Sequence, residues 1–152
     1  MKKLFAIVLT FALLMSLSVT AFAANTTGGD ADITTSIDPT YTVTIPADVN
    51  VQFNATETAF GAIEVTASQI HPNKCIKVEL TSDGKLENSI DATKVIPYAI
   101  KDADGAEFTA ATYLTEGDKT ELSIHITADD WNAAYAGDYS DTVVFTVSYE
   151  DK

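Results

Sequence analysis

The sequence contains no arginine, one cysteine and two histidines in 152 residues. The lack of arginine counts against recognition of nucleic acid or phosphate, because the planar guanidinium group is the side chain that usually binds these ligands. A single cysteine, Cys75, cannot form a disulfide within the chain. Stability must therefore come from a hydrophobic core, which the 46% of hydrophobic residues can supply. We interpret Cys75 as an inert free thiol, with a bond to a second chain as the alternative.

Long apolar runs are also lacking after the first 23 residues. Lys2 and Lys3 precede an apolar stretch from Leu4 to about Leu17, and Ala21-Phe22-Ala23 fits a small-residue cleavage site. Polar residues at 16, 18 and 20 interrupt the stretch before it reaches the roughly 20 apolar residues of a membrane-spanning helix. We interpret residues 1–23 as a signal peptide, which predicts a secreted, extracellular or cell-surface-associated protein with no membrane span after cleavage.

The rest of the chain is strongly acidic. The formal net charge is −13, and it becomes −15 when Lys2 and Lys3 are removed with the signal peptide. We interpret this charge as a means of solubility and self-repulsion outside the cell, with a specific cationic partner as the alternative. Residues 24–30 are small and polar and predict a flexible leader, and residues 31–152 have the length of a single domain.

Alternation of apolar and polar residues predicts short strands throughout this domain. The candidate strands are 31–37, 41–45, 49–53, 60–65, 75–81, 85–88, 95–101, 121–127 and 143–149. The segments 60–65 and 75–81 look like a strand pair, and Pro97 pushes its strand toward an edge or a bulge. Only residues 128–136 could form a helix, with Asp129 and Asp130 in its first turn. The pattern predicts an all-β, antiparallel two-sheet sandwich of immunoglobulin-like type.

The last strand carries the clearest pattern. Val143, Phe145, Val147 and Tyr149 fall on one face, and we expect this face to close the core. Gly137 and Tyr139 precede the strand, and we expect Tyr139 to act as a tyrosine corner whose hydroxyl bonds the backbone of the preceding crossover.

No residue set in the sequence predicts catalysis. His71 lies in a turn beside Pro72, and His125 lies on the solvent face of a strand, so neither belongs to a catalytic motif. The segment Asp102–Glu107 superficially resembles a calcium loop, but it lacks most of the ligand positions and predicts a hairpin instead. Trp131, Tyr135 and Tyr139 could form a sugar-stacking platform, and we favour packing at the sandwich end. We therefore expect neither an enzyme nor a cofactor nor a metal site.

The segment from Gly137 to Tyr149 resembles the final strand of fimbrial and spore-coat-U type secreted bacterial subunits, which have incomplete immunoglobulin-like folds. The segment Tyr41-Thr-Val-Thr-Ile-Pro46 resembles the opening of small surface-associated proteins of Gram-positive bacteria. Fimbrial subunits commonly carry a paired cysteine bridge, whereas this chain has one cysteine. The resemblance implies a non-enzymatic structural or adhesive subunit, such as a pilin-like filament subunit assembled by strand donation.

If the resemblance extends to assembly, Ala31, Ile33, Thr35 and Ile37 form the donor strand that fills the groove of a neighbour. The partner is then a second copy of the chain or another surface subunit. We favour closure of the chain's own sheet by this strand, because the Asp38-Pro39 turn allows it to fold back. The alternative function is a secreted binding module for a carbohydrate or a host protein, with loops such as 66–73 and 102–109 as its contact surface.

Overall fold

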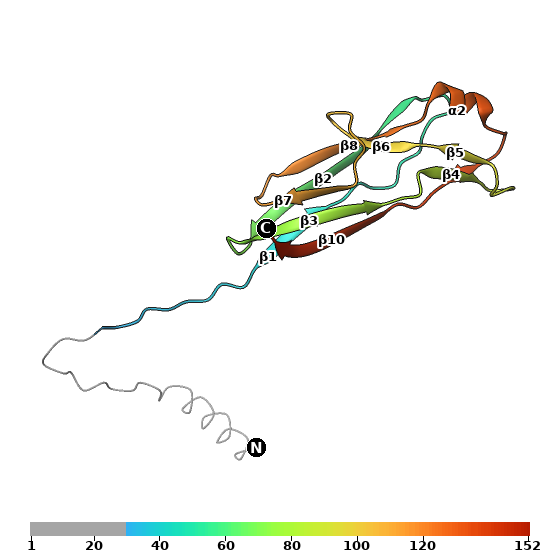
Figure 1. Cartoon of the computed structure of the whole chain (residues 1–152). Helices are drawn as coiled ribbons and strands as arrows, with labels where there is room; N and C mark the ends of the chain where they lie inside the picture. Colours follow the sequence, from blue (N-terminus) through green and yellow to red (C-terminus); the bar gives the residue numbers. More distant parts are fainter. Residues whose placement is uncertain (1–29) are drawn as a thin grey trace, which may run out of the picture. The chain divides into compact units, whose positions relative to one another are not determined.

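The computed structural model describes residues 30–152 (Figure 1). The expected signal peptide and all but the last residue of the expected leader lie outside the described residues. The chain divides into two units, Met1–Ser36 and Ile37–Lys152. Residues 30–36 of the first unit contain neither strand nor helix. The second unit holds every element described below, and the start of the domain at residue 31 stays a prediction.

Within residues 37–152 the chain forms ten strands and one short helix. In order along the chain they are β1 (Thr40–Thr44), β2 (Glu57–Gln69), β3 (Lys74–Thr81), β4 (Lys85–Asn88), β5 (Val95–Pro97), β6 (Ala99–Asp102), β7 (Ala110–Tyr113), β8 (Lys119–His125), α2 (Ala128–Ala133), β9 (Tyr139–Ser140) and β10 (Val144–Asp151). Among the described residues no helix is long and apolar enough to span a bilayer.

The strands form two layers. One layer is a four-stranded sheet in the order β1-β2-β8-β6. The other consists of two three-stranded sheets, β10-β3-β7 and β5-β4-β9, in which β3 leads into β4 and β9 leads into β10 (Figure 1). Every pair is antiparallel. The predicted all-β antiparallel sandwich is confirmed.

The core lies between the layers and follows from the alternation of side chains along each strand. Ile63 and Val65 of β2 and Ile76 and Val78 of β3 are fully buried. The inward face predicted for the strand at 121–127 is also confirmed, because its apolar residues Leu122, Ile124 and Ile126 are buried. Burial of each such side chain stabilises the fold by about 1.5–3 kcal/mol.

The helix α2 begins where its sequence indicates. The Thr127 side chain caps it by accepting a hydrogen bond from the Asp130 backbone N–H at 3.1 Å. Asp129 and Asp130 lie in the first turn, where carboxylates favour the exposed backbone amides. The helix spans six residues, so its stability comes from packing rather than from propensity.

Three strand predictions are wrong. Residues 31–37 and 49–53 form no strand. The segments 60–65 and 75–81 do not pair with each other, because β2 belongs to the four-stranded sheet and β3 to the opposite layer. A tight turn, closed by the Lys74 N–H donating to the His71 carbonyl at 3.0 Å, carries the chain from one layer to the other.

One strand predicted as continuous is interrupted. The strand at 95–101 divides at Tyr98 into β5 and β6, which are edge strands of opposite layers, so the effect predicted for Pro97 is confirmed. The last strand predicted, 143–149, corresponds to β10, and residues 141–143 separate it from the short strand β9. Tyr98 and residues 141–143 border the same groove, which is described next.

Candidate functional site

One edge of the sandwich is formed by β1 and β10, each of which pairs with a single neighbour, β2 and β3 respectively. At one end the edge is closed by the rings of Tyr41 and Tyr149, which stack with centroids 5.7 Å apart. The Tyr149 hydroxyl also accepts a hydrogen bond from the His71 backbone N–H at 2.9 Å. An ion pair of 2.8 Å joins Lys74 to Asp151 beside it. Stacking of Tyr41 on Tyr149 therefore holds the two layers together at this end, while the ion pair joins the paired strands β3 and β10 within one layer.

Beyond Thr44 the edge opens, because the chain leaves the sheet. Pro46 has no backbone N–H, so β1 cannot continue its ladder. Gly61 of β2 adopts φ +124°, and a Cβ atom on it would lie 3.4 Å from the Pro46 Cβ. The pairing of β2 with β8 shifts register at the same place, between Ala59 and Gly61. Glycine therefore permits the kinked backbone and the close approach that set residues 45–53 as one wall of the groove.

The opposite wall begins at Gly137, which has φ +146° and packs against Asn88. Asn88 is the one buried polar residue among residues 30–152, with 5% of its surface exposed. Its Oδ1 atom accepts a hydrogen bond from the Ile90 N–H at 2.9 Å, and its Nδ2 atom donates to the Ala136 carbonyl at 3.4 Å. This side chain thus fixes the chain entering β9.

Tyr139 strengthens the same wall. Its hydroxyl donates to the Tyr135 carbonyl at 3.0 Å and accepts from the Tyr135 N–H at 3.1 Å. This is the contact that defines a tyrosine corner. It holds residues 135–139 as a compact bend directly before β9.

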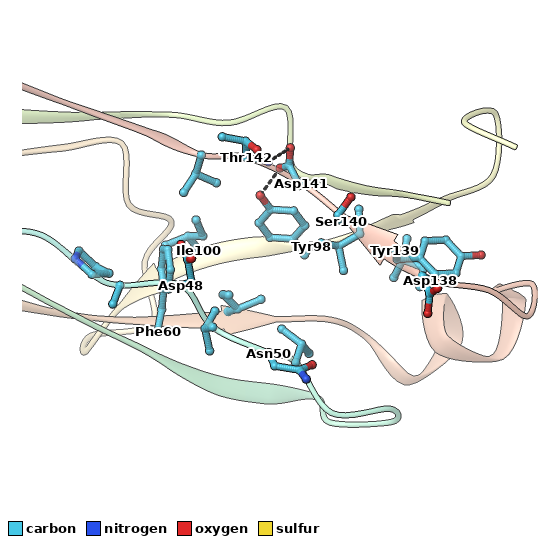
Figure 2. Close-up of a pocket in the computed structure, with 18 of the residues that line it drawn as sticks. Asp48, Asn50, Phe60, Tyr98, Ile100, Asp138, Tyr139, Ser140, Asp141 and Thr142 are labelled. Carbon is cyan, nitrogen blue, oxygen red and sulfur yellow. Dashed lines mark hydrogen bonds between the residues drawn. The ribbon is translucent and has the colours of Figure 1, made fainter. Parts of the chain in front are cut away.

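A hydroxyl network fixes the interruption between β9 and β10. The Tyr98 hydroxyl donates to the Asp141 carboxylate (Figure 2). The Ser82 Oγ atom lies 2.8 Å from the Tyr98 oxygen. Asp141 also accepts a hydrogen bond from the Thr142 N–H at 2.6 Å. Partial burial, together with the bond to Asp141, raises the pKa of Tyr98 to about 12. The phenol therefore stays protonated near neutral pH and remains a donor to the carboxylate.

A groove of about 820 Å³ lies between these walls, and its apolar floor is the core itself (Figure 2). Ile96, Ile100 and Ile124, which are buried core residues, line it from below. The rings of Phe60 and Phe145 lie beside each other there, with centroids 6.0 Å apart. The volume falls within the range of protein binding sites.

The expected closing strand does not cover the core completely. Phe145 and Tyr149 are half-buried, Val143 precedes β10 and is half-buried, and Val147 keeps 38% of its surface exposed. On the facing wall Ile45 is 44% exposed. The arrangement combines uncovered apolar side chains with strands that pair on one side only. Such an edge can bind one further β-strand, which would supply main-chain hydrogen bonds and apolar side chains together.

The expected donor residues lie outside any sheet. Ala31, Ile33, Thr35 and Ile37 belong to a segment without secondary structure, and all four are exposed. Ile33 is 98% exposed and Ile37 is 63% exposed. The segment forms no ladder in the described structure. Closure of the chain's own sheet by this segment, which the sequence favoured, and donation to a second chain both stay predictions.

Cys75 lies in β3 and is buried, with its sulfur 3.7 Å from the Glu150 carbonyl oxygen. His125 is half-buried on β8, where its Nε2 atom lies 2.9 Å from the Ser123 hydroxyl. The alternation along the strand places Ser123 and His125 on one face, because the two residues are two apart, but it did not predict their contact. Neither Cys75 nor His125 lines the groove.

The segment after β6 forms a hairpin, as predicted. The Asp102 side chain accepts hydrogen bonds from the N–H groups of Asp104 and Ala106, both at 3.0 Å. The backbones of Lys101 and Glu107 form an antiparallel β-bridge. The carboxylate therefore stabilises the turn. In the part of the chain that the structure describes, no three acidic, histidine or cysteine residues gather in a way that could hold a metal ion.

Of the aromatic residues near α2, Trp131 packs against the sandwich and Tyr135 is exposed. The Trp131 indole N–H donates to the Ala55 carbonyl at 2.8 Å, and Phe53 packs edge-on against the indole at 5.6 Å. Tyr135 is 63% exposed, with the Lys94 ammonium 4.9 Å from its ring centre. Trp131 thus serves packing, as favoured, and the three aromatic residues do not form one continuous platform.

No protein-family model matches the sequence, and no curated protein matches it. Among solved structures, this chain is similar to one chain of a structure described as "Chaperone-tip adhesin complex is vital for synergistic activation of CFA/I fimbriae biogenesis". The identity is 12% and the TM-score is 0.46, and the match covers 71% of this chain. It covers 42% of that chain, so the present chain spans less than half of its length. A similarity of this size concerns the arrangement of strands only.

Proposed function

We propose that the protein is a non-enzymatic, secreted or cell-surface structural or adhesive subunit whose groove is completed by a β-strand from another subunit. The observation that carries the proposal is the opening beyond β1, where core residues line a groove of about 820 Å³ between residues 45–53 and the chain that leads into β10. Apolar surface of this kind on an exported protein favours association. An added strand would bury it and pair the free edge in one step.

The chain also offers a strand of the right kind. Residues 31–37 alternate apolar and polar side chains, carry no secondary structure and are exposed. Ile33 and Ile37 lie on the same face of an extended chain, so both can enter a groove while their neighbours remain in water. In a filament the donor segment of each copy would complete the groove of the next copy.

The molar mass of purified residues 24–152, measured by size-exclusion chromatography with light scattering, tests this proposal. The measurement is made with reductant and at about 1 M salt, where the Debye length is about 3 Å and repulsion between acidic chains is weak. We expect a ladder of multiples of the monomer mass. The ladder should disappear when Ile33 and Ile37 are both changed to aspartate.

A mixing experiment identifies the acceptor side. Ile45→Asp places a charge in the groove wall at a side chain that is already 44% exposed, so the variant should still fold. The acceptor variant Ile45→Asp and the donor variant Ile33→Asp/Ile37→Asp should each stay monomeric alone. Together they should give dimers and nothing larger, because one intact groove and one intact donor remain. A monomer mass in every sample at high salt would refute strand donation between copies and favour a monomeric binding module.

A further inference from the structure

Negative charge lines both walls of the groove. Asp48 stands on the wall formed by residues 45–53, and Asp138 and Asp141 stand on the wall that leads into β10 (Figure 2). Among the residues of 30–152 that line the groove there is no lysine. A strand entering the groove must therefore pass carboxylates and meets no cation.

Two of these carboxylates have no compensating partner within the described structure. Asp141 accepts the hydrogen bond from the Tyr98 hydroxyl. Neither a hydrogen bond nor an ion pair to the side chain of Asp48 or Asp138 occurs among residues 30–152, where the ion pairs involve only Lys74, Lys77 and Lys119. The rim is thus a source of negative potential above an apolar floor.

The chain's own candidate donor is a poor electrostatic match for this rim. Asp30, Asp32 and Asp38 flank Ile33 and Ile37. In an extended strand whose isoleucines point into the groove, these three aspartates point outward, toward the rim and the solvent. Like charges brought together at an interface disfavour that pairing, and two whole chains of net charge −15 add long-range repulsion.

We infer that the preferred occupant of the groove is a strand from a different protein, with apolar side chains at alternate positions and lysine or arginine at the outward-facing positions. The inference rests on the proposed function, since it requires the groove to accept a strand. Opposite charge at the rim favours such a partner, whereas the acidic segment 30–38 of a second copy is held back at low ionic strength. The protein then acts as one component of a mixed assembly with a cationic partner subunit.

Fluorescent peptides test the inference directly. The first probe is residues 30–39 of this chain, the second carries Asp30→Asn, Asp32→Asn and Asp38→Asn, and the third carries lysine at the same positions. A fourth probe is the lysine peptide with Ile33→Ser and Ile37→Ser, which keeps the charge and removes the apolar anchors. Binding is measured by fluorescence anisotropy to the Ile33→Asp/Ile37→Asp protein, so that its own segment does not compete.

At about 0.01 M salt, where the Debye length is about 30 Å, we expect the lysine peptide to bind at least about tenfold more tightly than the native peptide, with the asparagine peptide between them. At about 1 M salt the three affinities should converge. The fourth peptide should not bind at either salt concentration. Its binding as tightly as the lysine peptide would overturn the inference, because charge alone would then suffice.

Rim variants assign the effect to the groove. Asp48→Asn with Asp138→Asn should reduce the preference for the lysine peptide at low salt by at least about threefold. The matched control is Asp104→Asn, which removes the same type of charge from the hairpin after β6, where the side chain does not line the groove. Equal binding of the first three peptides at low salt would overturn the inference and leave the proposed function standing. A preference for the lysine peptide that persists in the rim variant would have the same consequence. Binding of no peptide at any salt concentration would overturn the proposed function as well.

Discussion

Replacing Gly137 with alanine should destabilise the protein by about 2–6 kcal/mol, a large part of the 5–15 kcal/mol that holds a typical domain folded. Two effects add. The backbone at φ +146° is one that a side chain rarely adopts, at a cost of about 1–3 kcal/mol. The new Cβ would also lie 2.5 Å from the Asn88 Nδ2 atom, and Asn88 cannot move without leaving buried polar groups unpaired, at a further cost of about 1–3 kcal/mol.

The assay is equilibrium unfolding in urea, followed by the far-ultraviolet circular dichroism of the sheets. A lower midpoint with an unchanged slope reports lost stability. Gly105→Ala is the matched control, because Gly105 has φ +80° and a Cβ on it would meet nothing within 4 Å. This control should cost only the backbone strain, about 1–2 kcal/mol.

A double-mutant cycle separates the two effects. Asn88→Ala removes the amide that the new methyl group would strike, so Gly137→Ala in that background should cost about as much as Gly105→Ala. Equal losses for Gly137→Ala and Gly105→Ala in the otherwise native protein would refute the packing argument. So would an undiminished loss at Gly137 in the Asn88→Ala background.

The pKa of Tyr98 is raised to about 12, chiefly by burial, so this residue should contribute stability that is complete below pH 10 and is lost as the pH rises from 10 toward 12. The absorbance of phenolate as a function of pH, compared between the native protein and Tyr98→Phe, checks this. Titration of all tyrosines near pH 10 would contradict it. Asp118 has a lowered pKa because its carboxylate accepts hydrogen bonds from backbone N–H groups, that of Leu114 first. Its contribution is present above the ordinary pKa of 3.8 and is lost as the pH falls below it, so Asp118→Asn should remove part of the acid dependence of the urea midpoint. The Cys75 thiol, which is 5% exposed, should react with a thiol reagent only in unfolding urea, and rapid labelling of the native protein would show that it is accessible.

Alternation of apolar and polar residues correctly predicted which side chains face the core in strands that have one buried face and one face toward solvent. The strand at 121–127 buries its apolar residues Leu122, Ile124 and Ile126 as its sequence indicates, and Pro97 marks the point where a strand changes layer. The same patterns failed at 31–37 and 49–53. Alternation shows which residues could share a face, but it carries no information on whether a neighbouring strand is present to pair with them.

The groove could not be predicted from the sequence for a related reason. The pattern of the last strand indicates an inward face, and the structure leaves Val147 on that face partly uncovered because no strand within residues 37–152 pairs with the outer edge of β10. Gly61 and Asn88, which shape the walls, are single residues whose roles depend on partners distant in the sequence, Pro46 and Gly137. Local signals came from Pro46, because proline ends the ladder of β1, and from Gly137 and Tyr139, which marked the tyrosine corner.

The pairing of β10 with β3 also bears on how fast this protein folds. It joins residues as distant as Tyr149 and Ile76, and the β2 ladder with β8 joins Glu57 to His125. Chains dominated by such remote pairings fold in milliseconds to seconds, because the entropy of closing long loops must be lost before contacts form. Nearly the whole chain must be free to move before the second layer can assemble. The sheet β10-β3-β7 therefore cannot be complete until β10, the last strand along the chain that the structure describes, is free to pair with β3.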